Sequence, residues 1–301
     1  MRLRVLGTAA GGGLPQWNCA CPGCAGARAH PELRRRHASL AFKTSPGRWY
    51  LVNATPDLGE QIEAHPELHP GPARRHTPLA GVVLTDAELD HTLGIARLRE
   101  GEAVEIWSSP TTYRAVTDGL GLDRVLSPYT ELRHRPIGPR PVRMDPDLAG
   151  TVDVSAVPVS SKRPRYARTL DLDGQDWVVA LRLHDTATGR TLLYAPSVAA
   201  WTPALGDAVA EADCVILDGT FWDEDEPGRN GMSPATSTGM GHLPVTGADG
   251  SAVRLARSAR GSVYYTHLNN TNPLNDPASE ENRVLAEAGL HVAAEGMVID
   301  L

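Results

Sequence analysis

The most constraining feature of the sequence is a short apolar run that ends in a cluster of acidic residues and one histidine. Residues 82–84, bounded by Gly81 and Asp86, predict a short buried strand. The polar turn after it carries Asp86, Glu88, Asp90 and His91. Carboxylates and an imidazole at a strand end are typical metal ligands. The spacing also fits a solvated loop in which Asp90 caps the following helix, so the pattern alone leaves both interpretations open.

The pair Asp90-His91, followed by a turn of small residues, resembles the second half of the His-x-His-x-Asp-His signature of the metallo-β-lactamase fold. Where that superfamily has its first two histidines, this chain has Asp86 and Glu88. The resemblance therefore implies that the first metal site is absent or altered while the second survives, with His267 as its distant C-terminal ligand. Two histidines and one carboxylate form the arrangement that mononuclear, oxygen-activating Fe(II) favours.

Length, composition and charge limit the class of protein. The 301 residues, 41% of them hydrophobic, can bury one substantial core, and we find neither repeats nor a long linker, so we expect one domain over residues 1–301. A net charge of −7 argues against nucleic-acid binding, which relies on basic side chains to neutralise phosphates. No stretch approaches the roughly 20 apolar residues of a membrane span. Because a signal peptide is also missing, we expect a cytoplasmic protein; whether it forms a homodimer stays open.

Three of the four cysteines lie within six residues, at Cys19, Cys21 and Cys24. In a reducing compartment such a cluster is more typical of a structural zinc knot over residues 19–24 than of a disulfide. A closed set of thiolates usually binds zinc, and three free thiols are the alternative. The fourth ligand must come from elsewhere in the chain. The candidates are His30, His37 and Asn270.

Seven motifs spread over the chain narrow the family. They are residues 11–19 (Gly-Gly-Gly-Leu-Pro-Gln-Trp-Asn-Cys), 53–57, 85–94, 98–101, 217–222, 240–244 and 267–273. In combination they resemble the pyrroloquinoline quinone (PQQ) biosynthesis protein B family. The resemblance implies a metallo-β-lactamase-like α/β fold, an αββα four-layer sandwich of two mixed sheets, which agrees with the alternation of strands and helices along the chain.

Hydrophobic periodicity predicts where these elements lie. We expect strands at residues 1–7, 49–52, 82–84, 104–107, 152–157, 177–183, 191–194, 214–217, 262–266 and 298–301. We expect helices at residues 58–65, 110–120, 202–210, 251–259 and 279–288. The strands at 177–183 and 191–194 should form a hairpin. The proline-rich residues 133–146 are the best candidate for a loop over the site.

The family resemblance also suggests further site residues. Asp218 follows an apolar strand where the superfamily has a metal-binding carboxylate; here it either binds metal or caps its turn, and we predict a catalytic role together with His242 as an acid or base. A surface loop is the alternative for His242. The first metal site of the superfamily has a third histidine, and at that place this chain has the basic residues Lys162 and Arg163. The predicted substrate-binding residues are Lys162, Arg163, Asp86 and Glu88.

The resemblance implies an iron-dependent oxygenase. It would hydroxylate the tyrosine ring of a cross-linked Glu-Tyr intermediate on the way to PQQ or a related cofactor, with molecular oxygen as co-substrate. Asp90, His91 and His267 would hold Fe(II), and Cys19, Cys21, Cys24 and Asn270 a structural zinc ion. One alternative is a metal-dependent hydrolase such as a phosphodiesterase, which generally uses paired metals. The other is a non-catalytic carrier or transport factor for the quinone precursor.

Overall fold

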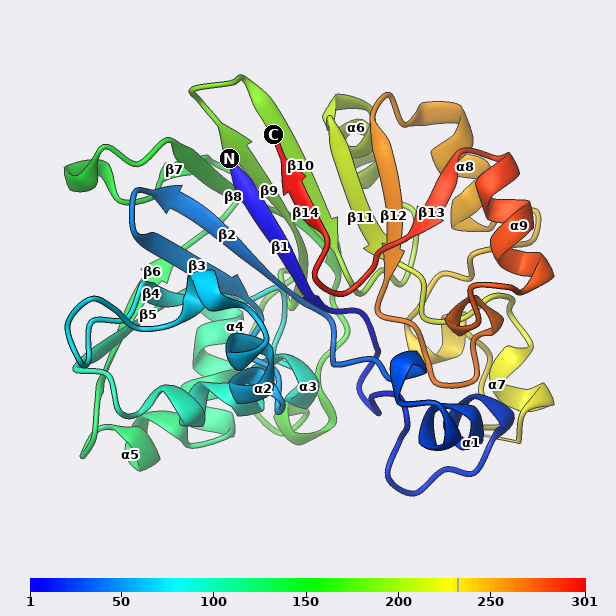
Figure 1. Ribbon diagram of the computed structural model, residues 1–301, viewed down its shortest axis with the longest axis horizontal. Helices are drawn as coiled ribbons and strands as arrows, with labels where there is room; N and C mark the ends of the chain where they lie inside the picture. Colours follow the sequence, from blue (N-terminus) through cyan, green and yellow to red (C-terminus); the bar gives the residue numbers. More distant parts are fainter. Residues whose placement is uncertain (232) are drawn as a thin grey trace.

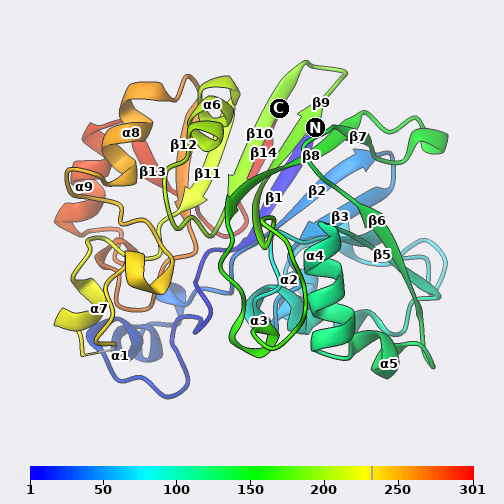
Figure 2. The ribbon, with the colours of Figure 1, turned by 180° about the vertical axis from the view of Figure 1, so that it is seen from behind.

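The computed structural model describes residues 1–231 and 233–301, and within them the chain forms two seven-stranded mixed sheets packed face to face. Helices cover both outer faces, as Figures 1 and 2 show. The strand order is β14-β1-β2-β3-β4-β5-β6 in the first sheet and β13-β12-β11-β10-β9-β8-β7 in the second. The predicted αββα sandwich is therefore confirmed.

Each predicted strand is present with differences at its ends, and the described residues form further strands, which were not predicted, at Ser39–Ser45, Glu131–Pro136, Val142–Arg143 and Leu290–Val292. The first sheet contains β1 (Arg2–Gly7), β2 (Ser39–Ser45), β3 (Arg48–Val52), β4 (Leu79–Val83), β5 (Ala103–Ser108), β6 (Glu131–Pro136) and β14 (Val298–Asp300). The second contains β7 (Val142–Arg143), β8 (Val152–Ser160), β9 (Val178–Asp185), β10 (Arg190–Ala195), β11 (Cys214–Asp218), β12 (Ser262–Thr266) and β13 (Leu290–Val292). The predicted hairpin is confirmed, since β9 and β10 pair antiparallel.

The helices on the side of the first sheet are α2 (Leu58–Glu63), α3 (Leu89–Thr92), α4 (Pro110–Arg114) and α5 (Leu122–Leu126). Those beside the second sheet are α6 (Pro203–Glu211), α8 (Ser251–Ser258) and α9 (Glu280–Glu287), while α1 (Pro22–Ala29) and α7 (Glu226–Arg229) lie beyond the end of that sheet. Three predicted helices begin behind side chains that cap them, since the hydroxyls of Ser109, Thr202 and Ser279 accept from amides of the first turn. In the described part of the chain, no helix combines the length and apolar character that a membrane span needs.

Alternation along the strands fills both faces of each sheet. In β2, Leu40 and Phe42 join the core between the sheets, whereas Ala41 joins the core beneath the outer helices. In β10, likewise, Tyr194 joins the core between the sheets and Leu193 joins the core beneath the outer helices. Because successive side chains of a strand point to opposite faces, both faces of each sheet are buried, which explains the nearly continuous apolar runs in the sequence.

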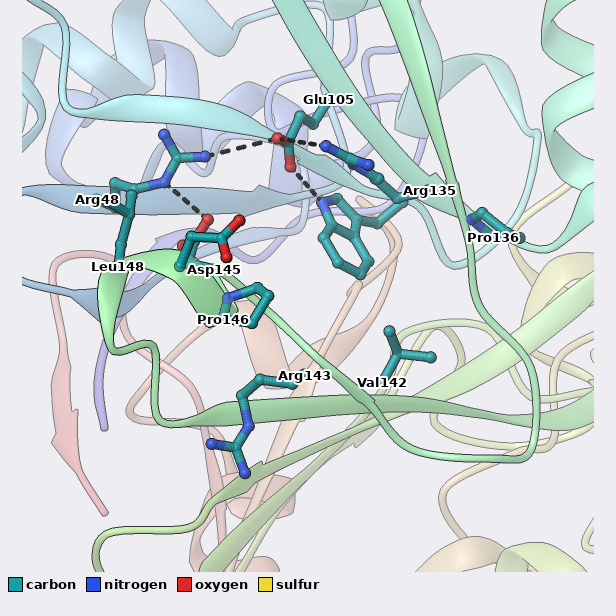
Figure 3. A pocket seen from close by; sticks show the side chains of 11 residues that line it. Arg48, Glu105, Arg135, Pro136, Val142, Arg143, Asp145, Pro146 and Leu148 are labelled. Carbon is teal, nitrogen blue, oxygen red and sulfur yellow. Dashed lines mark hydrogen bonds and ion pairs between the residues drawn. The ribbon is translucent and has the colours of Figure 1, made fainter.

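Residues 133–146 do not form the expected loop over the site. They hold the end of β6, at the edge of the first sheet, and β7, at the edge of the second. A cavity of about 580 Å³ lies between these edges (Figure 3). Its charged side chains neutralise one another: Arg48 contacts Asp145 at 2.8 Å, and Arg135 contacts Glu105 at 3.5 Å. Mixed charges and prolines in this segment therefore mark edge strands and a crossing between sheets.

The predicted site residues lie at the edge where the parallel strands end. β3 to β6 run parallel to one another, and so do β10 to β13. The carboxyl ends of parallel strands collect side chains at one edge of a sheet. This edge receives side chains from the turn after β4, from the end of β11 and from the residue after β12. The segment after β1 joins them, because Leu268 donates to Thr8 and accepts from Ala10, both at 2.8 Å.

Candidate metal centre

The short helix α3 carries Asp90 and His91 away from the end of β4. The turn before it is fixed by Asp86, whose Oδ1 accepts from the Glu88 amide at 2.9 Å. The carbonyl of His91 accepts from the Ala54 amide at 2.7 Å, so the loop after β3 holds the helix in place. Glu88 occupies the N-cap position, and Asp90 lies inside the first turn. The structure therefore does not support Asp90 as the helix cap.

Three hydrogen-bond acceptors meet at this helix. Oδ2 of Asp90 lies 3.3 Å from Nε2 of His267 and 3.7 Å from Nε2 of His91. Both oxygens of Asp86 contact Nδ1 of His91, at 2.8 and 2.7 Å, so Nδ1 carries a hydrogen and, in the neutral ring, Nε2 keeps its lone pair. His91 Nε2 is buried and has no hydrogen-bond partner among the described residues. A buried acceptor without a donor needs an explanation, and a cation held by these three atoms supplies one.

His267 reaches the centre from a backbone conformation that is unusual for its type. It follows β12 directly, and its φ of 60° lies in the left-handed region. Such a conformation costs on the order of 1–3 kcal/mol and persists only where the surroundings impose it. The next residue, Leu268, supplies that restraint through its two backbone hydrogen bonds to the segment after β1. The strain therefore serves to direct the imidazole towards Asp90.

Asp218 and His242 form a dyad beside His267. Oδ2 of Asp218 lies 2.7 Å from Nδ1 of His242 and also accepts from the Val198 amide at 2.8 Å. Oδ1 accepts from the amide and the hydroxyl of Thr220, at 2.9 and 2.6 Å. Asp218, His242 and His267 are close enough to suggest a second metal site. However, protein donors occupy all four lone-pair positions of this carboxylate, so Asp218 orients His242 rather than offering a ligand.

The electrostatics of the centre favour ionised carboxylates. Burial alone would raise the pKa of Asp90, but His91 and His267 hold it well below its usual range. Burial opposes the charged form of His91, yet Asp86 and Asp90 raise its pKa to about 9, so a metal ion at Nε2 would displace a proton from this ring. The pKa of His267 is lowered by burial, which outweighs the attraction of Asp90. Negative charge thus dominates the centre, as expected at a site for a cation.

The four predicted substrate-binding residues fall in different surroundings. Asp86 is buried with both oxygens on His91, so it cannot reach a substrate and instead orients the imidazole. Glu88 is half-buried, and burial together with Asp86 raises its pKa, while Lys162 opposes this. Lys162 donates to the carbonyl of Met240, next to the loop of His242. The guanidinium of Arg163 lies 5.2 Å from the ring centre of Trp177, in a cation–π contact.

The three clustered cysteines surround the side chain of Asn270. Its Nδ2 lies 3.2 Å from Sγ of Cys19 and 3.4 Å from Sγ of both Cys21 and Cys24. Its Oδ1 is buried and has no hydrogen-bond partner among the described residues. Since the two ends of an amide are assigned from their partners, turning it over would direct the orphan oxygen to the three sulfurs. In that orientation the four side chains would offer the closed set of ligands that a structural zinc ion takes.

The cysteine cluster is built on the start of α1. The thiol of Cys21 caps that helix and accepts from the amide of Cys24. Burial acts to raise the pKa of Cys21, but hydrogen bonds, first of all the one from this amide, lower it overall. The other two candidate ligands lie elsewhere. His30 is exposed at the far end of α1 beside Glu32, and His37 contacts the carbonyl of Gly11 at 3.3 Å.

Comparison with known proteins identifies the family. The model of the beta-lactamase superfamily domain matches residues 48–268. The coenzyme PQQ synthesis protein B of Azoarcus sp. (strain BH72) is 39% identical, and the match covers 100% of both chains. That of Klebsiella pneumoniae subsp. pneumoniae is 36% identical over 100% of this chain and 98% of its own. The chain belongs to the coenzyme PQQ synthesis protein B (PqqB) family.

Solved structures agree with this family. The crystal structure of Zn²⁺-bound PqqB from Methylobacterium extorquens has a TM-score of 0.90 and 31% identity over 100% of both chains. A diphosphatase of the PhnP family has a TM-score of 0.68 at 19% identity, covering 100% of this chain and 97% of its own, which shows the shared fold alone. A zinc-bound relative and the two ligand clusters together support metal binding by this member of the PqqB family.

Two residues of the PqqB-like motifs have positions that the sequence did not reveal. Asn53, with a φ of 65°, joins the end of β3 to Thr85 through both ends of its amide, each at 3.0 Å. It thereby fixes the turn that leads to α3. Thr220 lies between the imidazoles of His242 and His267. The only sequence signal for Thr220 was its spacing, because a threonine two residues after an aspartate favours a turn closed by the carboxylate.

Proposed function

We propose that this chain acts in PQQ biosynthesis as an iron-dependent oxygenase that hydroxylates the tyrosine ring of a Glu-Tyr-derived intermediate. The observation that carries the proposal is the convergence of Asp90, His91 and His267, whose ligand atoms lie within 4.8 Å of one another. One carboxylate and two imidazoles on one side of a metal leave adjacent positions open, as in mononuclear Fe(II) oxygenases. The names of the relatives supply the pathway.

The positions of Asp86 and Asp218 argue against a two-metal hydrolase. Both carboxylates are fully engaged by protein groups, and Asp86 stands where the superfamily has a histidine of its first metal site. Glu88 replaces the second such histidine. Hydrolases of this fold generally need two metals to hold the attacking and leaving oxygens. The remaining donors favour a single metal.

The side chains around the proposed iron site would have separate roles in the reaction. Bound Fe(II) would supply the oxygen and one-electron chemistry that no side chain provides. His242, with its Nδ1 held by Asp218, presents Nε2 as a base for the phenol proton of the substrate. Lys162 and Glu88 carry opposite charges and suit the carboxylate and ammonium groups of a Glu-Tyr-derived substrate.

The reaction must balance. Hydroxylation puts one atom of dioxygen into the ring and releases the other as water, which consumes two electrons and two protons. The assay therefore contains ascorbate as a reductant. Protein reconstituted without oxygen with one equivalent of Fe(II) should then take up oxygen and transfer one labelled atom from ¹⁸O₂ to the ring. Cleavage of a phosphodiester or a lactam without oxygen uptake would contradict the proposal.

Variants distinguish the proposed roles. His91→Ala and His267→Ala should lose iron and turnover together, because each removes a ligand. His242→Ala should keep its iron and lose turnover by about 10²–10⁴-fold, the usual contribution of a general acid or base. His30→Ala, which alters an exposed histidine, is the matched control and should behave as wild type. Unchanged iron in both His91→Ala and His267→Ala would overturn the ligand assignment.

A further inference from the structure

The buried hydroxyl of Thr220 contacts three functional side chains at once. Its Oγ1 lies 2.6 Å from Oδ1 of Asp218, 2.8 Å from Nδ1 of His267 and 3.1 Å from Nδ1 of His242. Thr220 is only 3% exposed, so water does not compete for these contacts. A single hydroxyl therefore links the proposed acid–base group to a proposed metal ligand.

Because the Thr220 hydroxyl has a single hydrogen, its contacts determine which nitrogen carries the hydrogen in the rings of His242 and His267. A threonine hydroxyl donates one hydrogen and accepts through its lone pairs, whereas an ionised carboxylate only accepts. The hydrogen of Thr220 must therefore go to Asp218, and the hydroxyl can only accept from the two imidazoles. A hydrogen on Nδ1 of His267 satisfies this contact, which at 2.8 Å is shorter than the 3.3 Å contact between Nε2 and Asp90. Nδ1 of His242 carries a hydrogen as well, because it faces both this oxygen and Oδ2 of Asp218 at 2.7 Å.

We propose that Thr220 is a positioning residue that sets the Nδ1–H tautomer of both His242 and His267. Each neutral ring then keeps the lone pair on Nε2. For His267 this is the nitrogen that faces Asp90, and for His242 it is the nitrogen left free to accept a proton. The inference rests on the proposed function only in taking His267 as a metal ligand and His242 as a base.

The hydroxyl is held in place by the segment that carries His267. The carbonyl of Thr220 accepts from the Asn269 amide at 3.0 Å and from Nδ2 of Asn272 at 3.2 Å. A Cβ at Gly219 would lie 3.0 Å from Cβ of Tyr265, so the turn packs tightly against β12. The geometry of the hydroxyl is thus fixed before any metal binds. Outer partners of this kind orient a ligating imidazole and fix its tautomer.

The direct test is the tautomeric state of the ring nitrogens, read by long-range ¹H–¹⁵N NMR on the full chain labelled with ¹⁵N-histidine. In metal-free wild type, both rings should show Nδ1–H with unprotonated Nε2 at a pH where they are neutral. Thr220→Ser keeps the hydroxyl and should preserve this pattern. Thr220→Val, of equal shape, should leave His267 as a mixture of tautomers and lower the affinity for Zn²⁺ by about 10–100-fold in a chelator competition.

Further outcomes decide against the inference. Wild-type tautomers and Zn²⁺ affinity in Thr220→Val would overturn it, and so would equal losses in Thr220→Ser and Thr220→Val, since packing and not the hydroxyl would then matter. If Thr220→Val does not fold by circular dichroism, Thr220→Ala takes its place with the same expectations. Failure of the oxygenase assay with a normal tautomer result would remove the proposed function and leave the role of Thr220 standing.

Discussion

Asp86 contacts Nδ1 of His91 with both carboxylate oxygens, at 2.8 and 2.7 Å, and both side chains are 1% exposed. Asp86 stands where the superfamily resemblance implies a histidine, and here it supports His91, which we propose as a metal ligand. A carboxylate behind a metal-bound imidazole fixes its orientation and strengthens its basicity. In the acidic turn after β4, the carboxylate of Asp86 therefore orients His91, and the carboxylate of Asp90 faces the opposite nitrogen of the ring.

Asp86→Asn should weaken metal binding. The amide can present its NH₂ group to Nδ1 of His91, which moves the ring hydrogen to Nε2 and blocks the nitrogen that faces Asp90. We expect the affinity for Zn²⁺ or Fe(II) to fall by about 10–100-fold, measured by chelator competition. Glu88→Gln, two residues away, is the matched control and should retain full affinity. A raised KM with unchanged metal content in Asp86→Asn would instead indicate the substrate contact expected from the sequence.

Asn270→Ala should lower zinc occupancy at the cysteine cluster. It removes the amide whose Nδ2 contacts all three sulfurs and whose oxygen would take that place when the amide is turned over. We expect the affinity for zinc to fall about tenfold or more, measured by metal analysis after dialysis against a graded chelator. Asn270→Asp supplies an equivalent oxygen and should retain zinc. If His30→Ala or His37→Ala loses zinc while Asn270→Ala keeps it, the fourth ligand is local and our assignment fails.

The sequence allowed the main elements and the centre to be predicted because both depend on short-range patterns. Apolar runs that end in polar turns marked β4, β11 and β12, and ligands at their carboxyl ends had to meet at one edge. The edge strand β6 was missed because its side chains are half-buried or exposed and it ends at Pro136, a pattern that resembles a loop. Edge strands tolerate such residues since one of their sides makes no ladder hydrogen bonds.

The roles of Asp86 and Thr220 could not be predicted for a different reason. Spacing places Asp86 beside His91 in the chain, but whether it faces a substrate or the imidazole depends on its side-chain rotamer and burial. Thr220 acquires its role only where β11, β12 and the loop of His242 meet. Contacts among residues 22 to 47 positions apart leave no periodic signal, so only the three-dimensional structure reveals them.

Gly23→Ala should separate the cysteine cluster from the segment that carries His267. A Cβ at Gly23 would lie 2.5 Å from the carbonyl oxygen of Asn270, closer than real Cβ contacts allow. We expect a lower thermal midpoint and weaker zinc binding. Gly26→Ala is the matched control in the same helix, because a Cβ there meets no atom within 4 Å and should stabilise by about 0.5–1 kcal/mol. Equal behaviour of the two variants would show that the close approach is unimportant.

Glu226 should give the protein a stability that falls as the pH rises through neutrality. Its side chain accepts from the Trp222 amide and the Thr271 hydroxyl, both at 2.6 Å, and so joins the turn after Asp218 to the segment after His267. Burial raises its pKa from 4.5 to about 7, although these two hydrogen bonds oppose the shift. The unfolded chain releases this proton near pH 4.5, whereas the folded chain retains it up to about pH 7.

Between these two values the folded state binds more protons than the unfolded state, so the free energy of unfolding decreases with rising pH, by about 1–3 kcal/mol in total. Glu226→Gln keeps an acceptor for the Trp222 amide but cannot ionise. It should match wild type near pH 5 and exceed it in stability at pH 8, measured by urea unfolding at several pH values. Glu287→Gln, at an exposed carboxylate, should follow the wild-type curve. Parallel curves for wild type and Glu226→Gln would show that the buried carboxyl does not control this dependence.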